Sequence, residues 1–282
     1  MRIRLSRSIV PNLFTVLNIY FGFLSIISAA QDQFVPALWY IVLSAICDSL
    51  DGLMARLTNS ASDFGVELDS LADVVGFGVA PSFLVYSLVL HDWGTLGILV
   101  SAAPLIMGAL RLARFNVQLV GFSKDYFTGM PIPLSALTLV SYVLYFSPEA
   151  IQTQETLQYG LMALTATCGT LMISTVRYPV VPSLTPRGFR DHPVLMLLFV
   201  AAALIAIVSQ GTMLFPALLL LIVSGPIFSA GRKLRATVQG KNSVAVQENG
   251  LQEGSGQSDA RDERGRQRSQ PDDNSATMDS ST

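Results

Sequence analysis

Charged residues are scarce in this chain: they make up 13% of its 282 residues, whereas a soluble domain carries roughly 25%. Hydrophobic residues make up 51% of the sequence, and the mean hydropathy is +0.49. This composition excludes an ordinary soluble domain. It predicts an all-α fold, a polytopic bundle of transmembrane helices whose main partner is the lipid bilayer. We expect no nucleic-acid partner.

Cysteine is rare as well. Cys47 and Cys168 are the only two, and both lie within apolar runs, without the spacing of a disulfide or a metal site. We therefore expect both to be small buried hydrophobic residues. The first apolar run lacks a small-residue cleavage site and is too long for a secretory signal peptide, so we expect it to be a membrane span.

Apolar runs long enough to cross a bilayer recur along the chain, since a helical span needs about 20 residues. We predict about eight spans, at residues 10–30, 35–56, 69–90, 94–116, 131–147, 156–176, 193–209 and 212–230.

The basic residues predict the orientation of these spans. If the N-terminus is cytoplasmic, all 18 lysines and arginines fall on the cytoplasmic side. The opposite loops, near residues 31–33, 91–94, 147–155 and 209–211, contain none. By the positive-inside rule, we expect both termini in the cytoplasm. We expect the protein to lie in the inner membrane of the cell.

The last part of the chain has a different composition. Residues 239–282 are rich in Gln, Ser, Asp, Arg and Gly and have almost no large apolar side chains. Such a segment cannot bury a core, so we expect a disordered cytoplasmic tail after a membrane-embedded domain at residues 1–238. A scaffolding protein with a binding tail would explain this segment, but it would not explain the acidic residues described next.

Four aspartates stand at helical spacing within the apolar region. The pattern is Asp48-x2-Asp51-Gly52-x2-Ala55-Arg56-x8-Gly65-x3-Asp69-x3-Asp73. Acidic residues in membrane segments are costly and usually functional. Residues three or four apart share a helix face, so two helices joined by the short loop at residues 57–63 would bring both pairs together at the cytoplasmic end. No lysine stands nearby to neutralise them, and divalent cations bind carboxylate oxygens well.

Alternative roles for the acids stay open. Any single aspartate could cap a helix or pair with a cytoplasmic arginine. A divalent-metal transporter would also place acids in the membrane, but its ligands usually lie near the midplane, between repeats. Here all four acids lie near one membrane face, and no second copy of the pattern follows. Asp63 and Glu67 fall outside the register, and we expect them to be solvated.

The spacing resembles the signature of the CDP-alcohol phosphatidyltransferase family at every specified position. That resemblance implies an integral membrane enzyme that displaces CMP from a CDP-linked lipid, using two Mg²⁺ or Mn²⁺ ions. It implies that Asp48 and Asp69 bridge both ions, that Asp51 completes the first and that Asp73 serves the second. Asp73 is then also the general base on the attacking hydroxyl. A homodimer is implied too.

The same resemblance assigns the CDP-lipid end of the site. Gly52, Arg56 and Ser62 match the family positions that hold the CDP moiety. Asn18, with Thr15 one turn away in the first span, could line the nucleotide pocket. Ordinary interhelical hydrogen bonding is an equally good account of that pair.

Three further stretches resemble the serine-accepting branch of the family. That resemblance implies CDP-diacylglycerol and L-serine as substrates. These stretches are residues 11–15 with Asn18, residues 111–116, and residues 127–133. Arg111 and Arg114 share a helix face and could bind the serine carboxylate, although anchoring arginines at lipid phosphates explain them equally well. Glycerol 3-phosphate and inositol phosphate are the alternative acceptors, and both would require a denser basic pocket. Choline would require an aromatic cage, which the sequence does not place near the signature.

Overall fold

The structure is a computed structural model that describes residues 9–58, 62–118, 127–174, 176–178 and 214–222. All of them belong to the first of two compact units, Met1–Ser229. The described elements, in chain order, are α1 (Ile9–Ala30), α2 (Phe34–Thr58), α3 (Asp63–Asp73), the π-helix η1 (Val74–Val79), α4 (Ala80–Leu88), the 3₁₀-helix η2 (Leu90–Trp93), α5 (Gly94–Gln118), β1 (Phe127–Thr128), α6 (Ile132–Phe146), α7 (Pro148–Thr153), α8 (Glu155–Ile173), β2 (Arg177–Tyr178) and a helix at residues 214–222.

Four helical stretches of the described residues are long and apolar enough to cross a membrane: Ile9–Ala30, Phe34–Thr58, Asp63–Leu88 and Leu90–Val117. They confirm the first four predicted spans, although the third begins at Asp63 rather than near residue 69. The predicted spans 131–147 and 156–176 are helices as well, of 15 and 19 residues. The predicted span 193–209 and the predicted tail at 239–282 lie outside the described residues, and only residues 214–222 of the predicted span 212–230 lie inside them.

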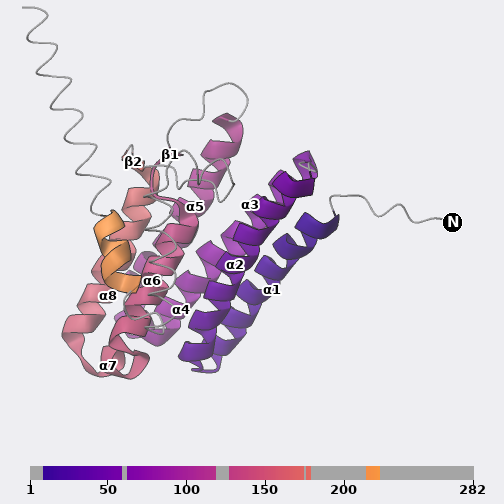
Figure 1. The fold of residues 1–282 in the computed structure, drawn as a ribbon. Helices are drawn as coiled ribbons and strands as arrows, with labels where there is room; N and C mark the ends of the chain where they lie inside the picture. The colour runs from indigo at the N-terminus through magenta and orange to yellow at the C-terminus, as the bar shows by residue number, and fades with distance from the viewer. Residues whose placement is uncertain (1–8, 59–61, 119–126, 175, 179–213, 223–282) are drawn as a thin grey trace, which may run out of the picture. The chain divides into compact units, whose positions relative to one another are not determined.

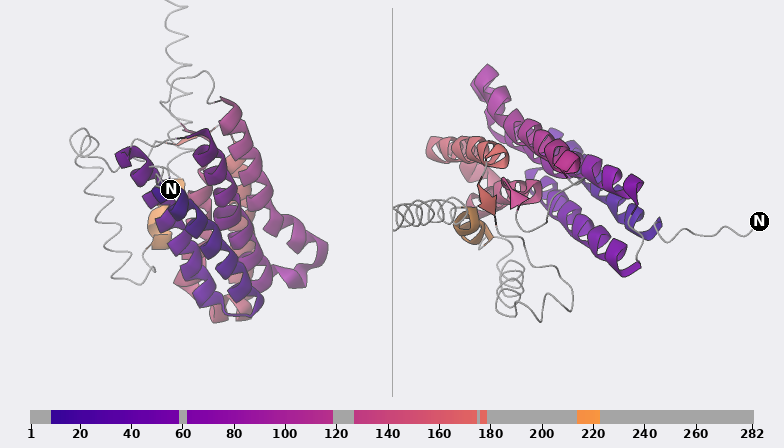
Figure 2. Two further views of the ribbon diagram at one scale, coloured as in Figure 1. Left: turned by 90° about the vertical axis from the view of Figure 1, so that its right-hand side faces the viewer. Right: turned by 90° about the horizontal axis from the view of Figure 1, so that it is seen from above.

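Helices pair along their lengths in the membrane region. α1 packs along α2, and α5 packs along α8 (Figure 1). A second pair of views shows the same neighbours (Figure 2). The turn between α1 and α2 lies at the same end as α7, and the β1–β2 pair lies at the other end (Figure 1).

α1 shows how these helices meet both lipid and protein. Its exposed face carries large apolar side chains at helical spacing, and its buried face carries small and polar ones. The exposed residues are Leu13, Val16, Tyr20, Phe23 and Ile27; the buried ones are Thr15, Asn18, Gly22, Ser25 and Ser28. A helix in water shows the reverse pattern, whereas small and polar residues at helix contacts are typical of membrane bundles. The chain is therefore an integral membrane protein.

A small antiparallel β-pair departs from the otherwise helical fold. β1 pairs with β2, with Phe127 opposite Tyr178 and Thr128 opposite Arg177. Next to it, the Gly129 amide donates to the Val176 carbonyl at 2.8 Å. Gly129 has a φ of +84°, and a Cβ there would overlap the carbonyl oxygen of Met172. Glycine therefore lets the start of α6 lie against the end of α8.

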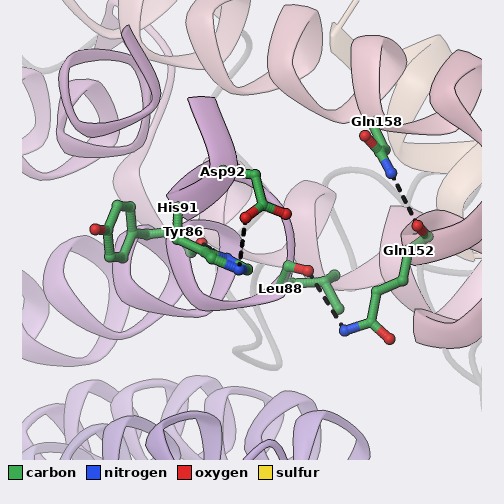
Figure 3. A network of polar contacts seen from close by, with 6 residues as sticks. All are labelled: Tyr86, Leu88, His91, Asp92, Gln152 and Gln158. Carbon is green, nitrogen blue, oxygen red and sulfur yellow. Dashed lines mark hydrogen bonds and ion pairs between the residues drawn. The ribbon is translucent and has the colours of Figure 1, made fainter. Parts of the chain in front are cut away.

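A polar network joins α4 and η2 to α7 and α8 (Figure 3). The ring nitrogens of His91 lie 3.3 Å from the Tyr86 carbonyl oxygen and 3.3 Å from an Asp92 carboxylate oxygen. The Gln152 amide donates to the Leu88 carbonyl at 3.5 Å, and the Gln158 amide donates to the Gln152 carbonyl at 2.9 Å. The network follows the C-terminal end of α4, about 25 Å from Asp73 at the usual helical rise, so it takes no part in the aspartate site.

Candidate active site

The α2–α3 hairpin brings the aspartates together. Asp48 and Asp51 lie one turn apart on α2, and Asp69 and Asp73 lie one turn apart at the end of α3. Carboxylate oxygens of Asp48, Asp51 and Asp69 all lie within 4.8 Å of one another. The carboxyl groups of Asp48 and Asp73 lie next to each other. The convergence predicted from the helical spacing is therefore confirmed.

Several oxygens of this cluster have no partner in the described part of the chain. Asp51 is only 6% exposed. Among the described residues, Asp51 Oδ2, Asp69 Oδ1 and Asp73 Oδ1 are buried and accept no hydrogen bond. No arginine in the described part of the chain forms an ion pair with them. Buried carboxylates without partners are strongly destabilising, and a cation bound among these oxygens could neutralise them.

The donor set fits hard divalent cations. Every donor is a carboxylate oxygen, which Mg²⁺ and Mn²⁺ prefer to nitrogen or sulfur. Asp63 and Glu67, which the helical register excludes from the cluster, are exposed as expected. The structure thus brings together the predicted ligands and keeps the nearby acids apart from them.

Open space lies beside the acids on α2. A Cβ added to Gly52 would meet no atom of the described residues within 4 Å, so no contact among them requires a glycine there. Arg56, one turn further on the same face, is exposed. A ligand phosphate can therefore approach the α2 backbone between the aspartates and Arg56.

Ser62 caps the N-terminus of α3. Its hydroxyl accepts a hydrogen bond from the Gly65 amide at 3.1 Å. A Cβ on Gly65 would lie 3.2 Å from that hydroxyl and 3.5 Å from Asn12 Oδ1, so α3 lies close to the start of α1. The cap explains why Ser62 stands here, and its contact with the CDP moiety stays a prediction.

Two polar residues of α1 face α2. The Thr15 side chain contacts the Asp51 carboxylate. Asn18 is fully buried, and its Oδ1 accepts a hydrogen bond from the hydroxyl of Ser44. Asn18 Nδ2 has no partner among the described residues. The interhelical hydrogen bond foreseen for this position is present, and the nucleotide contact of Asn18 stays a prediction.

Arg111 on α5 lies near Asp73. It is 8% exposed, and its Nε has no partner among the described residues. Two charged groups act on it: Asp73, which attracts it, and Arg114, which repels it. Arg114 Nη1 donates to the Ile173 carbonyl at 3.5 Å, at the end of α8. Asn116 on the same helix donates to Ser70 Oγ at 3.0 Å and ties α5 to α3.

Two further residues beside the aspartates were not predicted from the sequence. Ser44 stands one turn before Asp48 and bonds to Asn18, and Gly76 packs against both of them. The signals available in the sequence were the four-residue gap between Ser44 and Asp48 and the Gly-x-Gly-x-x-Pro run after Asp73, which breaks a helical pattern.

The chain belongs to the CDP-alcohol phosphatidyltransferase family, whose sequence profile matches residues 8–171. That range includes all the site residues described above. Among curated relatives, a CDP-diacylglycerol–serine O-phosphatidyltransferase of Helicobacter pylori is 47% identical over 173 residues, which cover 60% of this chain and 71% of the relative. The enzyme of the same name from Bacillus subtilis is 36% identical over 172 residues, which cover 60% of this chain and 89% of the relative. An archaetidylserine synthase of Methanothermobacter thermautotrophicus is 38% identical over 172 residues, which cover 60% of this chain and 69% of the relative.

Proposed function

We infer that this protein transfers a phosphatidyl group from CDP-diacylglycerol to the hydroxyl of L-serine, giving phosphatidylserine and CMP. The cluster of Asp48, Asp51 and Asp69, with orphaned buried oxygens and Asp73 beside it, is the observation that carries the reaction type. The relatives that act on serine, at 36–47% identity, support the acceptor.

The four aspartates would hold two Mg²⁺ or Mn²⁺ ions. When bound, such ions neutralise the pyrophosphate and stabilise the entering and leaving oxygens of the displacement. The protein supplies the geometry. The α2–α3 hairpin carries one pair of aspartates on each helix and holds the four carboxylates around one space. The small side of α2 at Gly52 leaves room for the pyrophosphate, and Arg56, Ser62 and Asn18 are assigned to the CDP-lipid.

Asp73 is the proposed general base. In the transfer, the serine oxygen forms a bond to the phosphorus of the phosphatidyl group, and the bond from that phosphorus to the CMP oxygen breaks. The proton of the serine hydroxyl passes to Asp73, because an alcohol is a poor nucleophile at neutral pH unless a positioned base accepts its proton. Asp73 lies where α3 ends, facing Asp48 across the hairpin.

Arg111 and Arg114 are the proposed acceptor site. The serine carboxylate needs a cation close to the base. Arg111 is buried near Asp73, and its Nε has no hydrogen-bond partner among the described residues. A guanidinium matches a carboxylate better than a point charge does. Glycerol 3-phosphate or inositol phosphate remains the alternative acceptor. A phosphate would also bind these arginines, but its higher charge would require a denser basic pocket.

We also propose about eight spans, both termini in the cytoplasm and an active site that faces the cytoplasm, in the inner membrane. Membership of the family, and no residue pattern of this chain, supports a homodimer. The uneven distribution of the basic residues supports the orientation. Transport of a divalent metal is the rival function, and the position of all four acids near the hairpin end argues against it.

Incorporation of radiolabelled serine into lipid tests the function directly. Purified protein in mixed micelles with CDP-diacylglycerol and Mn²⁺ or Mg²⁺ is expected to give phosphatidylserine and CMP in equal amounts, and chelation should stop both. Product from glycerol 3-phosphate but not from serine would show that the acceptor is wrong. Metal uptake into liposomes without CMP release would support the transporter.

Removal of the predicted tail should leave the enzyme active. The composition of residues 240–282 gives no means of burying a core, so we expect specific activity within about twofold of the full chain, as for other polar termini. The measurement is serine incorporation at equal amounts of folded protein. A large loss would show that the catalytic domain extends beyond residue 238.

A further inference from the structure

A π-helix interrupts the span that carries two of the aspartates. η1 (Val74–Val79) begins directly after Asp73, and its end is marked by a hydrogen bond from the Ala80 amide to the Val75 carbonyl. Pro81 is one cause, because proline has no amide proton and its ring clashes with the carbonyl four residues earlier. Single π-turns within α-helices occur often at functional sites.

The π-turn sets the direction of the aspartates. A helix advances about 100° per residue, so one extra residue in a turn rotates everything before it by about that angle relative to everything after it. α4 is fixed by the buried side chains of Leu84, Val85 and Leu88. If η1 relaxed to a regular α-helix, Asp69 and Asp73 would turn away from Asp48 and Asp51.

A contact among α1, α2 and η1 holds the π-turn in place. Gly76 is buried, and a Cβ there would overlap both Ser44 Oγ and Asn18 Oδ1. A Cβ on Gly22 would lie 2.9 Å from Gly76 Cα. We call Asn18, Gly22, Ser44 and Gly76 the Gly76 node.

The node is also tied by a buried hydrogen bond. Ser44 Oγ donates to Asn18 Oδ1 and lies 3.3 Å from the Asn18 carbonyl oxygen, and both residues are fully buried. Ser44 stands one turn before Asp48 on α2. The same contact therefore fixes α2 beside Asp48 and η1 beside Asp73.

We propose that the Gly76 node is a positioning device that sets Asp69 and Asp73 against Asp48 and Asp51; the inference rests on the proposed function for its kinetic readout. Ser44, Gly22 and Gly76 are positioning residues, because they act through the register of η1 and not on the substrates. Asn18 belongs both to the node and to the proposed CDP-lipid site. The node accounts for two buried glycines in contact between α1 and η1 and for a π-turn that begins one residue after a predicted base.

The first experiment compares two glycines of the same π-helix. Gly76→Ala inserts a methyl group against Asn18 and Ser44, whereas Gly78→Ala places it 3.2 Å from Leu105 Cδ1, the end of a flexible side chain. Both changes raise helix propensity equally. We expect kcat to fall about 100-fold in Gly76→Ala, as for a misplacement of about 1 Å at a reacting centre, and to stay within about threefold in Gly78→Ala.

Metal binding without substrates supplies a second readout. Mn²⁺ is expected to raise the unfolding temperature, and the measurement is the Mn²⁺ concentration that gives half of the maximal rise. We expect this concentration to increase at least tenfold in Gly76→Ala and to stay unchanged in Gly78→Ala. A merely structural role would lower the unfolding temperature without changing that concentration. This readout needs no acceptor alcohol, so it tests the positioning even if the serine assay shows that the proposed function is wrong.

Serine variants cover the case in which Gly76→Ala does not fold. Ser44→Ala removes the hydrogen bond without adding volume, and we expect roughly a tenfold loss of kcat and a matching loss of Mn²⁺ affinity. Ser49→Ala is the control, because Ser49 is exposed on the same helix and donates to the Ala45 carbonyl of its own helix, its one side-chain hydrogen bond among the described residues. In the double variant Gly76→Ala with Ser44→Ala, the freed space should restore kcat at least tenfold over Gly76→Ala.

Two results would overturn the inference. One is a Gly76→Ala protein that matches Gly78→Ala in turnover and in Mn²⁺ affinity. The other is a Ser44→Ala protein that matches Ser49→Ala in both. Either would show that the register of η1 does not depend on the node.

Discussion

Asp48→Asn and Asp69→Asn should each abolish turnover, and raising the metal concentration should not restore it. Both residues are proposed to bridge two ions, and their carboxylate oxygens lie within 4.8 Å of each other and of Asp51. Losing several kcal/mol of transition-state charge stabilisation corresponds to about a thousandfold or more in rate. The measurement is CMP release by the purified variants over a range of Mn²⁺ concentrations.

Asp63→Asn is the matched control for this prediction. It makes the same chemical change on α3, but Asp63 is exposed and lies outside the cluster. We expect its activity to stay within about twofold, with at most a small loss of stability because an acid in the first turn of a helix is favourable. Substantial turnover by Asp48→Asn at equal folded protein would contradict the two-metal assignment.

The aspartate cluster could be predicted from the sequence because local geometry determines most of it. Gaps of three and four residues put each pair of aspartates on one helix face. A short loop between two such helices makes them pack side by side. α3 begins at Asp63, further toward the N-terminus than residue 69, where the predicted span begins. Ser62 caps the helix there, and the span prediction did not take this cap into account.

The contacts around η1 could not be predicted in the same way. The hydrogen bond between Ser44 and Asn18 joins residues 26 positions apart, and the contact of Gly22 with Gly76 joins still more distant ones. A hydropathy pattern contains no information on which small residues of two helices meet. The β1–β2 pair was missed for a related reason: two residues in each strand are too few to give an alternating pattern.

Arg111→Ala should raise the KM for serine by roughly tenfold or more, with a smaller rise for Arg114→Ala. Removing a charged hydrogen bond from a bound carboxylate costs about 2–5 kcal/mol when the partner is left buried and unpaired. Arg111 is the deeper of the two and lies beside Asp73, whereas Arg114 also contacts the Ile173 carbonyl. The KM for CDP-diacylglycerol should change little in either variant, because Arg56 and the aspartates are assigned to that substrate.

Arg56→Ala provides the reciprocal control for the acceptor site. Arg56 is exposed at the end of α2, next to the open space at Gly52. We therefore expect its loss to raise the KM for CDP-diacylglycerol and to leave the KM for serine nearly unchanged, the opposite of Arg111→Ala. Because the two arginines belong to different helices, a crossed pattern of this kind cannot come from a general loss of folding. Equal weakening toward both substrates in Arg111→Ala would instead assign Arg111 to the phosphates or to the packing of α5, and the acceptor carboxylate would need another partner.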